Sequence, residues 1–178
     1  MSEAPVQALV ALGSNLGDRA TTLGRALSAL GVLPGTRLLA ASPAYDSDPV
    51  GLTDQPAFLN LVAAVETRQS PRELLTACLE IEGMLGRVRA ERNGPRTCDL
   101  DLLFHGKVRM EEPGLTLPHP RWSERGFVVF PLRDLLQMAP LAAETQWDWL
   151  RAETARTKVT RDGLRPWTGS TPWKTTAT

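Results

Sequence analysis

Residues 86–101, with the sequence GRVRAERNGPRTCDLD, carry a dense group of charged side chains. The acids Asp99 and Asp101 stand near its end, and four arginines precede them: Arg87, Arg89, Arg92 and Arg96. Apolar residues surround the acids, which predicts a strand over residues 97–104. Side chains two positions apart on a strand share a face, so Asp99 and Asp101 are expected to project together.

Two neighbouring carboxylates repel each other, and burying them even partly costs free energy. A divalent cation between them removes this cost, while nearby arginines suit an anion with several charges. The combination predicts a site for a Mg-bound polyphosphate. An Asp-x-Asp pair is also common on exposed strand edges, and clustered arginines also form solvated surfaces or contact nucleic acid. The stretch alone leaves these alternatives open.

Length and composition indicate one globular domain with a sizeable core. The chain has 178 residues, of which 42% are hydrophobic and 22% charged. Its 20 basic and 20 acidic residues balance, which argues against sequence-independent binding of nucleic acid. Cys78 and Cys98 lie in separate apolar runs and are expected to be buried free thiols. The sequence has neither a signal-peptide pattern nor an apolar run of membrane-spanning length, so the expected location is cytoplasmic.

The elements that would position the charged stretch begin with a short apolar run. Residues 6–12 predict a buried strand, and Asp18 is a suitable N-cap for a helix over residues 19–31. Between them, the turn at residues 13–17 resembles a phosphate-binding loop. It lacks the lysine of a Walker motif and the third glycine of a dinucleotide fingerprint, so a structural turn is favoured.

A second strand is predicted over residues 36–42 and a third over residues 58–66, separated by a loop rich in turn-forming residues. A loop of this length is typically functional or mobile. On the third strand, Phe58 and Asn60 share one face. An aromatic ring beside an amide suits a flat heterocycle, because the ring stacks and the amide reads hydrogen-bonding edges. The alternative is a core phenylalanine beside an amide that bonds the end of the strand.

Ser70 and Glu73 have the spacing of a capping box and predict the start of a second helix. Glu82 lies on or beside the apolar stripe of this helix and should have a partner, either in a structural ion pair with the arginines that follow or in a substrate contact. Further along, the prolines of LPHP at residues 117–120 hold His119 in a stiff, extended segment, which suits a ligand contact.

The order strand, helix, strand, strand, helix, strand predicts an α+β protein. The expected architecture is a ferredoxin-like βαββαβ antiparallel sheet with helices on one face and additional C-terminal elements. Those elements include a short helix over residues 133–138. Residues 1–157 are expected to form one domain, and residues 158–178, without periodicity, a poorly ordered tail.

Taken together, six segments resemble the 6-hydroxymethyl-7,8-dihydropterin pyrophosphokinase family. In order, they are GSNLGD at residues 13–18, YDSDPVG at 45–51, QPAFLN at 55–60, GRVR at 86–89, GPRTCDLD at 94–101 and LPHP at 117–120. The resemblance extends over residues 6–140. The last two segments are its most specific part, and the GSN turn is weaker.

The resemblance implies transfer of the β,γ-diphosphate of ATP to the hydroxymethyl oxygen of the pterin, with release of AMP, in folate biosynthesis. ATP is then the co-substrate, and two Mg ions are held by Asp99 and Asp101. Asp101 is also a candidate to accept the hydroxyl proton. Such a reaction depends on alignment and charge neutralisation, which fits these residues. The implied partners are the two small substrates, without nucleic acid or membrane, and the protein is expected to be a monomer.

The same resemblance assigns roles to individual residues. Arg87, Arg96 and Asp101 would be catalytic. The implied ATP contacts are Glu82, Arg87, Arg89, Arg96, His119 and Arg125. The implied pterin contacts are Ser47, Asp48, Val50, Phe58, Asn60, Asp99 and Phe127. In this set the two phenylalanines stack on the two faces of the pterin and Asn60 reads its edge. Residues 47–50 are expected to add backbone hydrogen bonds.

Some positions depart from the family pattern. Asn93 stands where some members have tryptophan, and the arginine loop is one residue shorter than in some members. Leu79 replaces a polar residue that contacts the nucleotide in some relatives. Gly86, Gly94 and Pro95 would let the arginine loop hinge as a lid.

Two other functions compete with this one. A different Mg-dependent nucleotidyl or phosphoryl transferase on the same fold would lack a pocket for a flat heterocycle, so Phe58, Asn60 and Phe127 distinguish the two. A non-enzymatic RNA-binding module predicts exposed aromatic residues on central strands, flanked by basic residues. Paired aspartates on a strand would repel an RNA backbone unless a metal ion were bound, which disfavours this second alternative.

Overall fold

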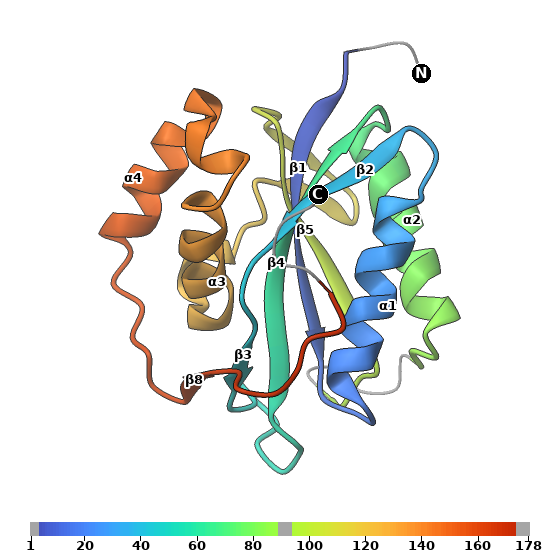
Figure 1. Cartoon of the computed structure of the whole chain (residues 1–178), viewed down its shortest axis with the longest axis vertical. Helices are drawn as coiled ribbons and strands as arrows, with labels where there is room; N and C mark the ends of the chain where they lie inside the picture. The colour runs from blue at the N-terminus through green and yellow to red at the C-terminus, as the bar shows by residue number, and fades with distance from the viewer. Residues whose placement is uncertain (1–3, 89–93, 174–178) are drawn as a thin grey trace.

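A computed structural model describes residues 4–88 and 94–173 (Figure 1). Its main sheet has the strand order β5-β1-β4-β3-β8, with β2 also paired to β4, and all of these pairs are antiparallel. The strands of this sheet are β1 (Val6–Ser14), β2 (Thr36–Ala41), β3 (Tyr45–Ser47), β4 (Phe58–Thr67), β5 (Asp99–His105) and β8 (Leu164–Pro166). A separate hairpin pairs β6 (Met110–Glu112) with β7 (Leu115–Leu117).

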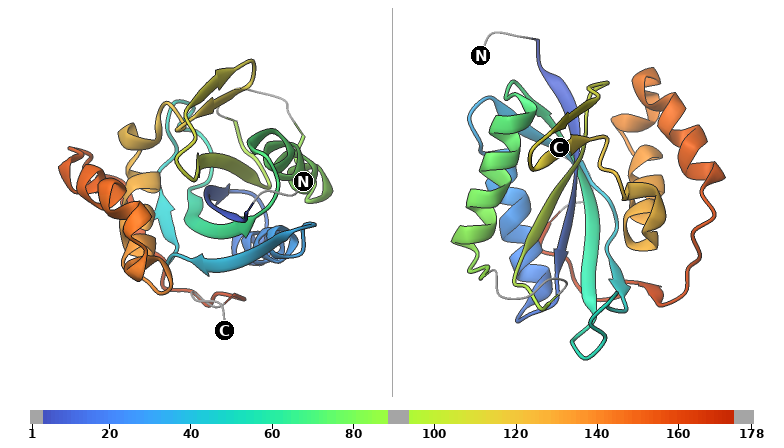
Figure 2. Two further views of the ribbon diagram at one scale, coloured as in Figure 1. Left: turned by 90° about the horizontal axis from the view of Figure 1, so that it is seen from above. Right: turned by 180° about the vertical axis from the view of Figure 1, so that it is seen from behind.

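Helices cover both faces of the main sheet (Figures 1 and 2). The α-helices are α1 (Arg19–Gly31), α2 (Pro71–Met84), α3 (Gly126–Leu136) and α4 (Asp148–Arg156). Short 3-10 helices are η1 (Trp122–Glu124), η2 (Leu141–Ala143) and η3 (Thr145–Trp147). The predicted α+β class and antiparallel sheet are confirmed. Only α1 and α2 share one face as expected, because the C-terminal helices α3 and α4 form a second layer on the other.

The central strands are buried on both faces, which explains their almost continuous apolar sequences. On β1, Val10 faces the core beneath α1 and α2, whereas Leu9 belongs to the core beneath α3 and α4. On β4, Leu61 and Val62 divide in the same way. The sheet is therefore held between two apolar layers, and the polar side chains that form the site lie toward strand ends.

Helix starts follow the sequence signals. Asp18 Oδ1 accepts a hydrogen bond from the Thr21 backbone N–H at 3.1 Å, so the predicted N-cap of α1 is confirmed. At α2, Ser70 Oγ accepts from the Glu73 N–H at 3.3 Å, and Glu73 Oε2 accepts from the Ser70 N–H at 2.7 Å. This reciprocal pair is the predicted capping box.

Two predicted elements have different bounds in the structure. The strand predicted over residues 36–42 is β2, which ends at Ala41 shortly before Pro43, a residue with no N–H to donate, and pairing resumes at β3. Ser42 Oγ accepts from the Val62 N–H at 3.0 Å at this break. The helix predicted over residues 133–138 is α3, which begins at Gly126 because its apolar first turns are buried against β4.

The C-terminal segment differs from the expected poorly ordered tail. Leu164–Pro166 forms β8, which pairs with β3 at the edge of the main sheet. Arg133 of α3 also donates to Thr157 Oγ1 at 3.0 Å. A strand of three residues is too short to show a periodic pattern, so it could not be predicted. Residues 174–178 of the predicted tail lie outside the described residues.

Both cysteines are buried and free, as predicted. Burial raises the pKa of each thiol to about 12, with the carboxylate of Glu82 as the next cause. Within residues 4–88 and 94–173, every helix is too short or too polar to span a membrane.

Candidate functional site

The candidate site is a cavity of about 380 Å³ at one end of the main sheet. Side chains from β3, β4, β5 and the start of α3 meet in its walls. Predicted site residues that line it are Ser47, Asp48, Val50, Phe58, Asn60, Arg96, Asp99, Asp101, Arg125 and Phe127. The structure thus brings together residues that the sequence places in four separate segments.

Asn60 is held in one orientation at the base of this cavity. The residue is 6% exposed, and its Nδ2 donates to Ser47 Oγ at 2.6 Å across the β3–β4 pair. Gly13 lies opposite Asn60 in the β1–β4 register, and a Cβ at Gly13 would stand 2.9 Å from Asn60 Oδ1. A glycine is therefore needed for this close approach. Nearby, the Arg96 guanidinium lies 5.5 Å from the centre of the Phe58 ring.

Asp99 and Asp101 face the same cavity from β5, as the strand periodicity predicts. Leu100, between them, is 2% exposed and belongs to the core beneath α1 and α2. Burial raises the pKa of Asp101 to about 6, with the nearby charge of Asp99 as the second cause. Arg125 opposes this shift, and its Nη1 lies 3.7 Å from Asp101 Oδ2.

Asp99 is paired with two of the predicted phosphate-binding arginines. Its Oδ1 lies 2.6 Å from Arg87 Nη1, and its Oδ2 lies 2.9 Å from Arg96 Nη1. Arg87 also bridges to Glu82, with Nη1 at 2.7 Å from Oε1. Charge-assisted contacts of this length hold both guanidinium groups beside the cavity.

Glu82 is 3% exposed and lies behind Arg87, outside the cavity lining. Its Oε1 also accepts a hydrogen bond from the Leu100 N–H at 2.8 Å. Glu82 therefore joins α2 to β5 and holds Arg87 at the same time. Of the two alternatives from the sequence, the geometry favours the structural ion pair over an ATP contact.

His119 lies beside the cavity rather than in its lining. Its backbone N–H donates to Leu103 O at 2.9 Å, which fixes the LPHP segment to β5. Burial lowers the pKa of the imidazole, and the charges of Arg125 and Arg121 lower it further. His119 Nδ1 accepts from the Arg121 N–H at 3.1 Å, so the neutral ring carries its proton on Nε2. Arg89, Arg92 and Asn93 lie outside the described residues. The ATP contact expected at Arg89 and the departure from the family pattern at Asn93 therefore stay predictions from the sequence.

The glycine-rich turn after β1 has the structural role that the sequence favoured. Asn15 is 2% exposed, and its Oδ1 accepts from the Arg96 N–H at 2.9 Å. Its Nδ2 donates to Gln55 Oε1 and to Pro56 O, both at 2.9 Å. Asn15 thus ties the loop before β4 to the segment that carries Arg96. Sequence reasoning missed this link because its partners are far apart along the chain.

The C-terminal segment adds residues to the cavity that sequence reasoning missed, among them Thr160 and Asp162. In addition, the Asp48 N–H donates to Gly163 O at 2.8 Å. The backbone donor of Asp48, expected to bond the pterin, is therefore engaged with this segment. An aperiodic, threonine-rich sequence carries no signal that would have predicted either feature.

Fold and site together define an α+β protein with a pocket that joins an aromatic–amide pair to carboxylates and arginines. Residues 9–137 match the family model described as 7,8-dihydro-6-hydroxymethylpterin-pyrophosphokinase. The chain belongs to this family, as the sequence resemblance predicted.

Two relatives in the same family illustrate the similarity, and both are named 2-amino-4-hydroxy-6-hydroxymethyldihydropteridine pyrophosphokinase. The protein of Pseudomonas aeruginosa is 50% identical over 126 residues, which are 71% of this chain and 78% of the relative. The protein of Bacillus subtilis is 38% identical over 160 residues, which are 90% of this chain and 89% of the relative.

Among solved structures, wild-type Plasmodium falciparum HPPK-DHPS with pterin and p-hydroxybenzoate matches with a TM-score of 0.61 at 13% identity. The match covers 93% of this chain and 47% of that one. A second HPPK-DHPS structure, in complex with substrates, has a TM-score of 0.59 at 11% identity, with 92% and 47% covered. The chain thus spans about half the length of these larger proteins, and the likeness concerns the fold.

Proposed function

We propose that this chain transfers the β,γ-diphosphate of ATP to the hydroxymethyl oxygen of 6-hydroxymethyl-7,8-dihydropterin, forming the pterin diphosphate and AMP in folate biosynthesis. Membership of the family and the names of the two bacterial relatives support this activity. The observation that carries the proposal is the single cavity lined by Phe58, Asn60, Arg96, Asp99 and Asp101. One substrate pocket beside one polyphosphate site is what a transfer between ATP and a heterocycle requires.

The pterin is bound at the Phe58 and Asn60 end of the cavity. Phe58 and Phe127 stack on its two faces, and the Asn60 carboxamide reads its edge. The 2.6 Å bond from Asn60 Nδ2 to Ser47 Oγ supports this role, because it fixes the direction in which Oδ1 accepts. The contact proposed at Asp48 then comes from its side chain or carbonyl, since the Asp48 N–H bonds Gly163 O, while Ser47 and Val50 keep the backbone contacts expected of them.

Mg is the metal that fits the carboxylate pair. Within residues 4–88 and 94–173, three or more His, Cys, Asp or Glu side chains nowhere gather as a metal cage. Mg typically takes one or two carboxylates and completes its coordination with water and substrate phosphates, so Asp99 and Asp101 are a suitable donor set. Burial, and after it the charge of Asp99, raises the pKa of Asp101 to about 6, and a cation bound to the pair would offset this cost of charging it. Two Mg ions held here would neutralise charge on the ATP phosphates and orient the hydroxyl.

The arginines provide the rest of the charge compensation. Arg87 and Arg96 lie against Asp99, and both exchange this carboxylate for phosphate oxygens when ATP binds. Asp101, beside the pterin hydroxyl, accepts its proton. His119, through Nε2–H, and Arg125 contact the nucleotide, as does Arg89. Glu82 orients Arg87 for this task.

We also interpret the strand order as the ferredoxin-like βαββαβ topology, with residues 1–157 as one pyrophosphokinase domain extended by β8. The equal numbers of acidic and basic residues support small-molecule substrates in place of nucleic acid. A cytoplasmic monomer remains our expectation for the cellular form.

The experiment that tests the proposed function is a product assay with ATP, Mg²⁺ and the pterin, in which AMP is measured by chromatography. We expect AMP to form only when the pterin is present. Formation of ADP would indicate a single phosphoryl transfer, and free diphosphate would indicate a nucleotidyl transferase; either result would overturn the proposal.

A further inference from the structure

Residues 157–167, here called the C-terminal strap, run from the end of α4 to β8 at the edge of the main sheet (Figure 1). The strap lies outside residues 9–137, which match the family model. Its residues were not among those predicted to form the site, yet several of them line the cavity.

The first half of the strap is attached to α3. Arg133 of α3 donates to Thr157 Oγ1 at 3.0 Å and to the Thr154 carbonyl at 2.9 Å. The Arg161 guanidinium lies 4.2 Å from the centre of the Phe130 ring, also on α3. These contacts fix the direction in which the strap leaves α4.

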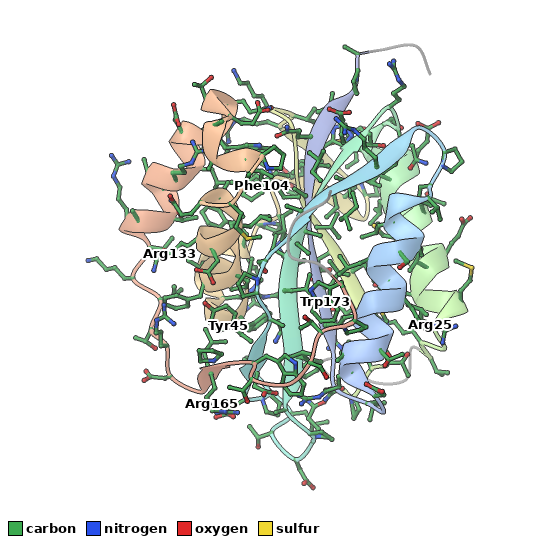
Figure 3. The ribbon with its side chains drawn as sticks, in the orientation of Figure 1. Arg25, Tyr45, Phe104, Arg133, Arg165 and Trp173 are labelled. Carbon is green, nitrogen blue, oxygen red and sulfur yellow. The ribbon has the colours of Figure 1, made fainter. Side chains whose placement is uncertain are left out.

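The second half of the strap is attached to β3 and the loop that follows it. Gly163 O accepts from the Asp48 N–H at 2.8 Å, and Arg165 Nη2 lies 3.0 Å from Asp48 Oδ1. The Trp167 N–H donates to Ala44 O at 2.9 Å. Arg133, Tyr45 and Arg165 follow one another down this side of the molecule (Figure 3). The strap therefore spans the gap between α3 and the sheet edge.

Between these attachments the strap faces the cavity. Thr160, Asp162 and Gly163 line it together with Phe58 and Asn60. The strap also packs tightly against the start of α3, because a Cβ at Gly126 would stand 2.9 Å from Thr160 O. Residues of the strap thus form part of the cavity wall.

We infer that the C-terminal strap is a positioning element for the pterin, and that Gly163 is its key residue. The strap closes the outer side of the pterin end and holds Asp48, from which the loop before β4 departs. This inference rests on the proposed function, since it assigns the pterin to this end of the cavity. The strap bonds Asp48 and Ala44, whereas Arg96 and Asp99 pair with each other, so we expect its effect to fall on the pterin.

Gly163 is the position where the strap depends most on one residue type. Its φ is +67°, and a Cβ there would stand 2.8 Å from Asp48 Oδ2 and 3.1 Å from Asp48 Cβ. A β-branched residue at this φ is strongly disfavoured, so Gly163→Val should displace the strap from Asp48. Gly114 provides the matched control, because its φ is +75° and a Cβ there would meet nothing within 4 Å.

The test compares Gly163→Val with Gly114→Val in the full chain, with Kd measured for the pterin by its own fluorescence and for ATP by calorimetry. We expect the Gly163→Val variant to bind the pterin at least about tenfold more weakly, with ATP binding within about twofold of wild type. At saturating pterin, its kcat should stay near wild type while its KM for the pterin rises. Gly163→Asn should restore part of the affinity, since asparagine tolerates positive φ. The Gly114→Val variant should bind both substrates normally.

Equal effects of the two valine variants on pterin affinity would overturn the inference, and so would equal losses of pterin and ATP affinity in Gly163→Val. Should that variant fail to fold, hydrogen exchange on the wild-type protein decides the matter. The pterin alone should slow amide exchange in residues 159–166 and ATP alone should not; unchanged exchange with the pterin would overturn the inference. Wild-type protein that binds the pterin without forming AMP would contradict the proposed function only, whereas absence of pterin binding would contradict both.

Discussion

Arg87 and Asp99 form an ion pair in which Nη1 lies 2.6 Å from Oδ1. Arg96 pairs with the other carboxylate oxygen of Asp99 at 2.9 Å, and Arg87 is also held by Glu82. A cation and a polyphosphate that bind at this point must therefore exchange partners with the protein. In the proposed reaction the phosphates would take over the arginines, and the cation would take over the carboxylate. Binding of metal and nucleotide would be linked as a result.

The Arg87→Met variant separates the two sides of this exchange. Without the guanidinium, a cation no longer competes with Arg87 for Asp99, and Mn²⁺ should bind the ATP-free variant more tightly than it binds wild type. ATP should bind about 10- to 100-fold more weakly, the cost of one charge-assisted hydrogen bond. Electron paramagnetic resonance of Mn²⁺ and calorimetry of ATP measure the two affinities. Arg37→Met, which breaks an exposed pair with Glu66, is the control and should change neither. Weaker Mn²⁺ binding in Arg87→Met would contradict the exchange.

Asp101→Asn should lose activity and gain stability. The pKa of Asp101 is raised from 3.8 to about 6, so the folded protein binds a proton more readily than the unfolded chain. The stability linked to this proton is present below about pH 4 and is lost as the pH rises through about 6. At pH 7.5 wild-type Asp101 is charged and this stability is lost, whereas the neutral side chain of the asparagine variant carries no such charge. Because the side chain is 36% exposed, solvent screening reduces the gain to about 1 kcal/mol of unfolding free energy.

Thermal melts between pH 4 and pH 8 check this prediction, and the gap between variant and wild type should widen over that range. Turnover should fall by at least about 1,000-fold, because a ligand of the proposed metal ions is lost. A variant that is less stable than wild type at pH 7.5, or that retains turnover, would refute the assignment.

Glu82→Ala should lower the stability of the fold more than it weakens the binding of ATP. The change leaves the Leu100 N–H, bonded to Glu82 Oε1 at 2.8 Å, without its acceptor in the core, and it removes one partner of Arg87. We expect a loss of about 3 kcal/mol in unfolding free energy, measured by urea titration. Glu80→Ala is the control on the same helix, since Glu80 is exposed and should cost little. An unchanged stability with a raised KM for ATP would show that Glu82 is an ATP ligand instead.

Asn60→Ala tests the pterin end. Loss of the carboxamide of this residue, which is 6% exposed, should weaken pterin binding about 10- to 100-fold, because hydrogen-bonding groups of the pterin then remain unpaired. ATP binding should stay within about twofold of wild type. Fluorescence titration of the pterin and calorimetry of ATP provide the comparison. If both affinities fell together, Asn60 would be a structural residue that holds β3 to β4.

Local rules predicted much of this site because they depend on neighbours in sequence. Strand alternation placed Asp99 and Asp101 on one face and Leu100 in the core, and the capping box at Ser70 began α2 where expected. The partners of Glu82 depend on how α2 packs on β5, which the sequence leaves open. For that reason the choice between an ion pair and an ATP contact had to wait for the structure.

The features that sequence reasoning missed join segments far apart along the chain. Asn15 bonds residues on two different loops, and Gly163 bonds Asp48 through backbone atoms, whose contacts leave no pattern in side-chain types. Strand β8 is three residues long and has no periodicity. In each case the packing of distant segments determines the contact, and local propensity carries no information about it.

The central claim is that the β- and γ-phosphates of ATP move together to the pterin, and a labelled substrate tests it most directly. With ATP labelled by ³²P at the β-phosphate, the wild-type protein, Mg²⁺ and the pterin, we predict that the label appears in the pterin product and that the AMP is unlabelled. Label that remained in ADP or appeared as free diphosphate, with an unlabelled pterin, would contradict the account.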